Sequence, residues 1–323
     1  MRPVRMVTST RTASSPHLKT TGIAIPNNLT VRRPLFALFS PRICCIGGDP
    51  RDRAAENTDR TIRDEGDLKR RGYQSVSAVS VELKDVGKTF PGGVEAVGSV
   101  DLSLVSGGVT AILGPTGCGK STILRIIGGL EAPTRGQVDI SATPRLGFCF
   151  QDPRLLPWRS VRRNVSLPLE LAGVHPDEIR DRVDRKIALV GLEDAHDRLP
   201  AALSGGMRMR TALARALVSE PELLLLDEPF GALDEVTRLR LEEELADLVR
   251  KGTITTLLVT HSIAEAVFLA DRVIVLDRMP ARVRSTLEIP FDDRISSLRV
   301  DPEFVEMQAA IYQQLRAGAG AIA

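Results

Sequence analysis

The stretch that most constrains this chain is a glycine-rich nonapeptide that runs directly into a helical pattern. It reads Gly114-Pro115-Thr116-Gly117-Cys118-Gly119-Lys120-Ser121-Thr122. This fits G-x-x-x-x-G-K-[ST], a loop whose backbone N–H groups surround the phosphates of a nucleotide. The apolar run 109–113 before it predicts a buried strand, and 121–127 predicts the start of a helix. The sequence therefore predicts a phosphate-binding loop between a strand and a helix.

The residue types of this loop suit contact with a phosphate chain. Its glycines let the backbone approach closely because they carry no Cβ, and the helix N-terminus adds positive potential. Lys120 is placed to reach the β- and γ-phosphate oxygens, and the Ser121 hydroxyl is placed to complete a Mg²⁺ shell. The competing interpretation, a plain glycine turn between strand and helix, is disfavoured by the full length and correct flanks of the motif.

A second group of polar residues follows two predicted strands. Asp227 and Glu228 come directly after four leucines at 223–226, a run typical of a central parallel strand buried on both faces. Ligands bind at the carboxyl edge of such sheets, so we expect Asp227 to hold Mg²⁺ through water and Glu228 to act as general base toward an attacking water. His261 ends the buried run 255–260 and is expected at the same edge. A surface acidic pair and a structural histidine are the alternatives.

Charge is divided unevenly along the chain. The first 76 residues carry 14 Lys and Arg against 7 Asp and Glu, a net of +7, whereas the remainder carries 29 against 34, a net of −5. The mildly acidic main body disfavours a nucleic acid as partner. The four cysteines include no C-x-x-C pair, which favours a reducing cytosol over a disulfide framework. No apolar run approaches the ~20 residues of a membrane-spanning helix, so work at a membrane would require a partner.

Residues 1–78 predict a basic extension and linker outside the folded domain. Residues 1–48 contain no acidic residue and are rich in Ser and Thr, as in organelle transit peptides and in disordered basic tails. Five prolines in this stretch interrupt any long amphipathic helix. Residues 49–71 mix charges of both signs, as a solvated linker does. We expect disorder or a reading frame begun too far upstream, with organelle targeting as the alternative.

From residue 79 onward strand and helix patterns alternate. Charged helical patterns over about 152–220 predict a small helical subdomain, in which the apolar residues of 177–190 recur three or four apart. Further strands are predicted at 81–86, 99–104, 137–140, 146–150, 272–276 and 283–289, and a last helix at about 302–315. This alternation predicts an α/β fold with a mostly parallel sheet covered on both faces, in one domain over 79–323.

Six short sequences in a fixed order make the chain resemble the ATP-binding subunit of an ABC transporter over roughly residues 79–317. They are the phosphate loop, Gln151 after a strand, Leu203-Ser204-Gly205-Gly206-Met207, the acidic strand end 223–228, Gly231-Ala232-Leu233-Asp234, and His261. The resemblance implies a P-loop NTPase fold of the ABC type. Such a fold has a mostly parallel core sheet, an N-terminal antiparallel β subdomain and an inserted helical subdomain. It also implies that the chain binds and hydrolyses ATP with Mg²⁺.

The resemblance assigns roles to residues that surround one nucleotide. Phe90 is implied to stack on adenine, with a core phenylalanine as the alternative. Gln151 is implied to touch Mg²⁺ and the attacking water. His261 is implied to hold the γ-phosphate and to position that water.

The resemblance also implies a site shared between two copies. Ser204, Gly205 and Gly206 would bind the γ-phosphate of the nucleotide held by the second copy, and Asp234 would cross the dimer interface. Met207 stands where the family most often has glutamine. This departure puts a finer contact in doubt but leaves the phosphate-facing atoms of Ser204 and the glycine backbone in place.

A finer resemblance is to importers of the nitrate, sulfonate and taurine type. It rests on Phe150-Gln151-Asp152-Pro153-Arg154-Leu155-Leu156-Pro157-Trp158-Arg159-Ser160-Val161 and on Leu203–Met207, the signature sequence, running into Arg208-Met209-Arg210. It implies a homodimer on the cytoplasmic face of the inner membrane, docked on two membrane-spanning permease subunits that receive cargo from an extracytoplasmic substrate-binding protein. Plain core packing is the alternative for Trp158. A soluble ABC ATPase of the cluster-assembly type is the alternative for the whole chain.

Overall fold

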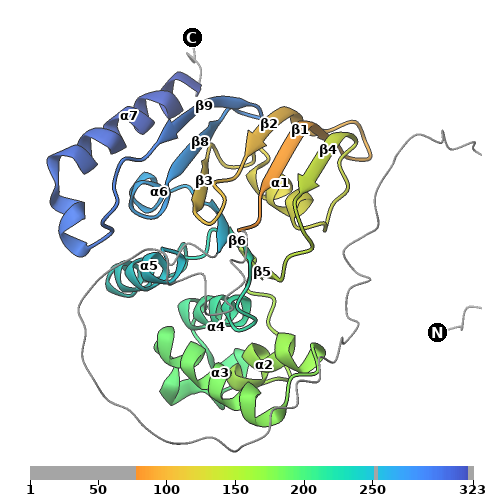
Figure 1. The fold of residues 1–323 in the computed structure, drawn as a ribbon, viewed down its shortest axis with the longest axis vertical. Helices are drawn as coiled ribbons and strands as arrows, with labels where there is room; N and C mark the ends of the chain where they lie inside the picture. The colour runs from red at the N-terminus through yellow and green to blue at the C-terminus, as the bar shows by residue number, and fades with distance from the viewer. Residues whose placement is uncertain (1–77, 251–253, 319–323) are drawn as a thin grey trace, which may run out of the picture. The chain divides into compact units, whose positions relative to one another are not determined.

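The computed structural model describes residues 78–250 and 254–318, so the basic extension expected over 1–78 lies outside it apart from its last residue. Figure 1 shows the smaller of two sheets, a three-stranded one in the order β2-β1-β4. β1 (Val81–Thr89) pairs antiparallel with both β2 (Glu95–Ser103) and β4 (Arg135–Ile140). The expected N-terminal antiparallel part is confirmed, and β4 returns to it after the phosphate loop.

The larger sheet has six strands in the order β5-β6-β7-β3-β8-β9. The strands are β3 (Val109–Leu113), β5 (Leu146–Cys149), β6 (Leu223–Asp227), β7 (Thr255–Val259), β8 (Arg272–Leu276) and β9 (Val283–Glu288). All neighbouring pairs are parallel except β8 and β9. Those two are antiparallel because only residues 277–282 join them, and a parallel pair needs a longer crossover. The mostly parallel sheet is therefore confirmed.

The four leucines of β6 lie on two different hydrophobic clusters. Leu224 and Leu226 belong to the cluster that contains the helical region, whereas Leu223 and Leu225 belong to the one that contains the antiparallel sheet. Side chains alternate across a strand, so a strand covered on both faces needs an apolar residue at every position. Each buried leucine contributes roughly 1.5–3 kcal/mol to folding.

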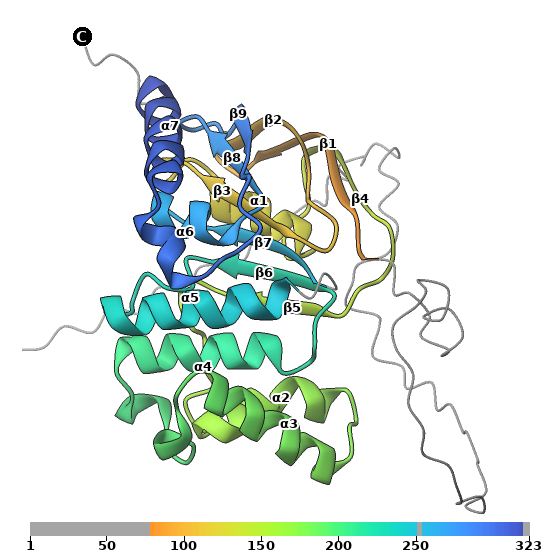
Figure 2. The same ribbon diagram turned by 60° about the vertical axis from the view of Figure 1, so that its left-hand side comes forward.

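The helical subdomain consists of α2 (Val161–Leu171), α3 (Pro176–Leu189) and α4 (Gly205–Leu217). The stripe predicted on α3 is confirmed, because Val183 and Ile187 are buried. Figure 2 shows α4 between the sheet and the other two helices, and α4 contacts β5 on one side and α2 and α3 on the other. Helix α4, which begins at Gly205 within the sequence Leu203–Met207, thus connects the larger sheet to α2 and α3.

The described residues contain four more α-helices and three short 3-10 helices, Glu193–Ala195, Pro200–Ala202 and Ser296–Val300. The four α-helices are α1 (Lys120–Ile127), α5 (Glu235–Val249), α6 (Ile263–Leu269) and α7 (Pro302–Gly318). The sequence pattern did not predict α6, because this helix has seven residues and five consecutive ones, 265–269, are buried. A helix buried nearly all round lacks an amphipathic period. None of the helices within the described residues combines the length and the hydropathy of a membrane span.

A buried hydrogen bond between Arg299 and Glu242 fastens α5 to the segment before α7. Glu242 is 1% exposed and accepts a hydrogen bond of 2.7 Å from Arg299 Nη2. The Arg299 guanidinium also lies 3.6 Å from the ring centroid of Phe268 on α6. Burial raises the pKa of Glu242 to about 7, although the positive charge and hydrogen bond of Arg299 oppose the rise.

This carboxyl makes the stability of the protein depend on pH. The unfolded chain ionises Glu242 near pH 4.5, whereas the folded protein keeps it protonated up to about 7. Its stabilising contribution is therefore full below pH 4.5 and is lost between pH 4.5 and 7. The loss in free energy of unfolding is about 3 kcal/mol at most. Urea unfolding at several pH values should show Glu242→Gln with a flatter profile than the natural chain. Glu306→Gln on the exposed side of α7 is the control, and an unchanged profile in Glu242→Gln would contradict the assignment.

Candidate active site

Four neighbouring parallel strands, β5, β6, β7 and β3, end at the same edge of the sheet. β3 leads into the phosphate loop, β6 ends at Asp227, and β5 and β7 end shortly before Gln151 and His261. Because parallel strands present their carboxyl ends together, four segments far apart in sequence converge there. The topology therefore explains how the expected residues meet.

Glycine is required in the phosphate loop by space as well as by backbone conformation. Gly119 precedes α1 with φ of +108°, and a Cβ there would lie 2.4 Å from the carbonyl oxygen of Ala96. A Cβ on Gly114 would lie 2.8 Å from Cys118 Sγ. Gly119 caps α1 without a side-chain hydrogen bond, so no side chain competes with an anion for the first helical N–H groups.

Lys120 lies inside the curve of the loop. Its Nζ donates hydrogen bonds of 2.8 Å and 2.9 Å to the carbonyl oxygens of Gly114 and Pro115. Only 5% of the residue is exposed. The loop thus holds a positive charge at its centre, where phosphate oxygens would bind.

Ser121 and Asp227 lie side by side, although 106 positions separate them. The Ser121 hydroxyl donates a 2.9 Å hydrogen bond to Asp227 Oδ1. Burial raises the pKa of Asp227, the hydrogen bond from Ser121 opposes this, and the negative charge of Glu228 adds to the rise. A hydroxyl and a carboxylate side by side form an oxygen donor set that suits Mg²⁺.

Glu228 lies next to two other expected catalytic side chains, Gln151 and His261. Its Oε2 accepts a 3.2 Å hydrogen bond from Gln151 Nε2 and lies 3.3 Å from His261 Nδ1. Glu228 has φ of +48°, a left-handed conformation that is uncommon outside glycine and concentrates at functional sites. The structure brings these three residues together as the sequence predicted.

The signature residues lie against the Gly231–Asp234 turn. Ser204 caps α4 by accepting a hydrogen bond of 3.2 Å from Met207 N. A Cβ on Gly206 would lie 3.2 Å from the carbonyl oxygen of Ala232. Within residues 78–250 and 254–318, no hydrogen bond joins residues 204–206 to the phosphate loop. Within the described residues, one copy of the chain therefore does not join these two sets of residues by hydrogen bonds.

Asp234 begins α5 as its N-cap. Its Oδ1 accepts a 3.0 Å hydrogen bond from Thr237 N, which lowers the pKa of Asp234. The position is exposed, so the side chain is available to a second copy. The role at a dimer interface stays a prediction.

Phe90 is half-buried just after β1, and Lys88 Nζ lies 5.1 Å from the centroid of its ring. This position is compatible with a stacking surface, and adenine stacking stays a prediction.

Cys118 of the loop is 1% exposed within the hydrophobic cluster under α1. Burial raises the pKa of its thiol, so Cys118 fills space beneath the loop and presents little reactive thiolate.

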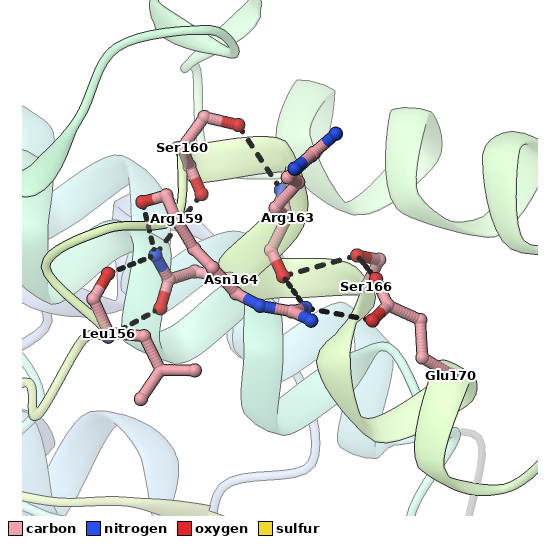
Figure 3. A network of polar contacts seen from close by, with 7 residues as sticks. All are labelled: Leu156, Arg159, Ser160, Arg163, Asn164, Ser166 and Glu170. Carbon is pink, nitrogen blue, oxygen red and sulfur yellow. Dashed lines mark hydrogen bonds and ion pairs between the residues drawn. The ribbon is translucent and has the colours of Figure 1, made fainter.

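The segment that follows Gln151 is held by two residues that sequence reasoning missed. Asn164, fully buried on α2, accepts a hydrogen bond of 2.8 Å from Leu156 N, and the two hydrogens of its Nδ2 group are shared among the carbonyl oxygens of Leu156, Arg159 and Ser160 (Figure 3). Arg215, in the last turn of α4, donates to the carbonyl oxygens of Pro153 and Arg154. Sequence reasoning could have found Asn164, because it is an asparagine at an otherwise apolar position of a helix. No feature of the sequence pointed to Arg215.

Comparison with known proteins agrees with this geometry. The ABC transporter family model matches residues 97–231. The nitrate import ATP-binding protein NrtD of Synechococcus elongatus is 44% identical over 220 residues, covering 64% of this chain and 80% of the relative. The aliphatic sulfonates import ATP-binding protein SsuB 1 of Pseudomonas savastanoi pv. phaseolicola is 43% identical over 230 residues, covering 71% and 92%.

Solved structures with the same fold include two of one bacterial ABC transporter cassette, MJ0796. One is described as its dimeric structure and the other as a dimeric post-hydrolysis state bound to ADP and Pi. Each aligns with a TM-score of 0.62 at 33% identity, covering 65% of this chain and 99% of the cassette. The order of signature sequences, the fold and these likenesses agree.

Proposed function

The chain belongs to the ATP-binding subunits of ABC transporters, and on that premise we propose that it powers import of a small anion of the nitrate or sulfonate class. It hydrolyses ATP, and the observation that carries the site assignment is the meeting of Glu228 with Gln151 and His261 beside the phosphate loop. The names of the relatives support a role in import, since those proteins are described as nitrate and sulfonate import subunits.

The bound nucleotide is proposed to take Mg²⁺ at the edge formed by Ser121 and Asp227. The Ser121 hydroxyl and Asp227 carboxylate are oxygen donors 2.9 Å apart, and the side-chain oxygen of Gln151 would complete the set. When bound, Mg²⁺ offsets the negative charge that develops on the β- and γ-phosphate oxygens. Lys120 supplies a further positive charge from within the loop, and the N-terminus of α1 binds phosphate oxygens through its N–H groups.

The chain's own residues are proposed to divide the hydrolytic step. Glu228 Oε2 accepts a proton from the attacking water as that water adds to the γ-phosphorus and the bond to the bridging oxygen breaks. Gln151 Nε2 and His261 Nδ1 both lie against Glu228 Oε2, which fixes the orientation of the carboxylate. His261 also faces the γ-phosphate and restrains the water, so three residues define one line of attack.

The nucleotide is proposed to lie between two copies of the chain. The signature residues of one copy lie against their own 231–234 turn, which leaves the α4 N-terminus available to the γ-phosphate bound by the other copy. The dimeric cassette at 33% identity supports this arrangement. ATP joins the two copies and hydrolysis removes that bridge, so the dimer opens and closes with each turnover.

The exposed segment after Gln151 is proposed as part of the contact with membrane-spanning subunits. Trp158 is 72% exposed, so the alternative of core packing for this residue is wrong. An aromatic side chain left in water is a common anchor of protein interfaces. The assembly would place this peripheral subunit on the cytoplasmic face of the inner membrane, with an extracytoplasmic binding protein delivering cargo.

Reconstitution tests this function directly. The full chain co-expressed with its neighbouring membrane subunits should co-purify with them, and the complex in vesicles should take up labelled nitrate, taurine or an alkanesulfonate only with ATP. The same complex carrying Trp158→Ala should lose co-purification, whereas Leu199→Ala, another exposed apolar side chain of the helical part, should keep it. DNA-stimulated hydrolysis by a chain that does not co-purify with the membrane subunits would contradict the import proposal and favour a soluble ABC ATPase.

A further inference from the structure

The turn that carries His261 is fastened by a relay of three polar groups. Ser262 N donates a 3.0 Å hydrogen bond to Thr260 Oγ1, and the Thr260 hydroxyl donates one of 2.5 Å to Glu265 Oε2. In the reverse direction Glu265 N donates to Ser262 Oγ at 3.2 Å. The backbone on both sides of His261 is therefore tied to the first turn of α6.

Thr260 and Glu265 are buried, whereas the imidazole ring of His261 is exposed. Thr260 is 1% exposed and Glu265 is 5% exposed, but 62% of the His261 side chain is exposed. Across the described residues the ring has a single hydrogen-bonding or ion-pair partner, Glu228. A ring with so few contacts of its own takes its position from its backbone, and that backbone is held by Thr260 and Glu265.

The usual local arrangement would not need Thr260. In a capping box the Glu side chain bonds directly to the backbone N–H of the N-cap residue, which here is Ser262. This chain inserts the Thr260 hydroxyl between the two groups. The Thr260 hydroxyl therefore links the N-cap of α6 to the residue directly after β7. The turn that carries His261 is thus held by both the helix and the end of the strand.

We propose that Thr260 and Glu265 are positioning residues that hold His261 toward Glu228 and the γ-phosphate. The proposal rests on the function proposed above, because it gives His261 a part in the hydrolytic step. The Glu265 carboxylate accepts its hydrogen bond from Thr260, and Glu265 N donates to Ser262, so in this proposal Glu265 acts through the turn. Burial raises the pKa of Glu265, and the Thr260 hydroxyl and the positive charge of Arg238 oppose that rise.

Two matched substitutions, one on β7 and one directly after it, separate an effect on the position of His261 from an effect on stability. Thr260→Val removes the relay hydroxyl at nearly constant volume and should lower kcat for ATP about ten- to a hundred-fold, as a misplacement of about 1 Å does. Thr256→Val is the control, since Thr256 is equally buried on β7 and its hydroxyl has no hydrogen-bond partner. It should leave kcat unchanged. Affinity for a fluorescent ATP analogue should stay the same in both variants, because the phosphate loop is untouched.

Two further comparisons test whether Thr260 and Glu265 act through His261. The first uses conservative variants that should restore kcat, and the second combines Thr260→Val with His261→Ala. Thr260→Ser and Glu265→Gln keep the hydroxyl and an acceptor oxygen, so both should retain most of the natural kcat, whereas Glu265→Ala should match Thr260→Val. In a His261→Ala background, Thr260→Val should cause no further loss. An additive loss, or equal kcat in Thr260→Val and Thr256→Val, overturns the positioning proposal alone. Full activity in His261→Ala overturns the proposed role of His261 and the positioning proposal with it. Should Glu265→Ala fail to fold, the near-isosteric Thr260→Val carries the test.

Discussion

Glu228→Gln is expected to lower the rate of ATP hydrolysis by about 10³-fold, because an amide cannot accept the proton of the attacking water. ATP should still bind, since Lys120 and the phosphate loop are unchanged. The amide keeps the size of the side chain, and its oxygen can still accept from Gln151 Nε2, which lies 3.2 Å from Glu228 Oε2 in the natural chain. We therefore expect Glu228→Gln to accumulate as an ATP-bound dimer.

Light scattering with Mg-ATP should show this dimer, and phosphate release should give the rate. Glu222→Gln is the matched control, because Glu222 directly precedes the same strand and forms an ion pair with Arg145 away from the site. That control should hydrolyse ATP at the natural rate. A monomeric Glu228→Gln protein with ATP bound would contradict the shared site, and normal turnover would exclude Glu228 as the base.

Lys120→Met is expected to weaken ATP binding by about 10²-fold or more, because hydrogen bonds from an ammonium to phosphate oxygens contribute about 1.5–3 kcal/mol each. Methionine keeps much of the apolar stem but leaves the carbonyl oxygens of Gly114 and Pro115 without their present donor. Binding and hydrolysis should therefore both fall.

Titration with a fluorescent ATP analogue measures the first effect, and circular dichroism checks that the chain still folds. Lys84→Met is the control, since Lys84 is an exposed lysine on β1 with surface ion pairs only. Unchanged affinity in Lys120→Met would mean that the loop does not bind phosphates in the expected way.

Much of the fold followed from residue patterns that each have a single physical solution. Four consecutive leucines are typical of a strand covered on both faces, and β6 is such a strand. The phosphate loop had to join a strand to a helix because its glycines leave the helical N–H groups open. The convergence of Asp227, Glu228 and His261 followed from the rule that parallel strands share a carboxyl edge.

What the sequence did not predict depends on contacts between distant parts of the chain or on very short elements. Asn164 and Arg215 act on carbonyl oxygens of the segment after Gln151, and no periodicity encodes such bonds. Helix α6 was not predicted, because a helix buried on nearly all sides shows no alternation of apolar and polar residues at the helical period. The relay through Thr260 and Glu265 was missed for a similar reason, since a buried threonine at a strand end looks like any β-branched core residue.

Helix α4 has a mechanical consequence that follows from what stands at its two ends. Ser204 lies at its N-terminus, and Arg215 in its last turn holds the carbonyl oxygens of Pro153 and Arg154. Thirteen helical residues form a stiff rod about 20 Å long, which moves as one piece. In the proposed dimer, a force on Ser204 from the nucleotide of the other copy would be transmitted along α4 to the segment beside Gln151, which Arg215 holds. The proposed γ-phosphate contact at Ser204 and the proposed docking segment after Gln151 would then move together.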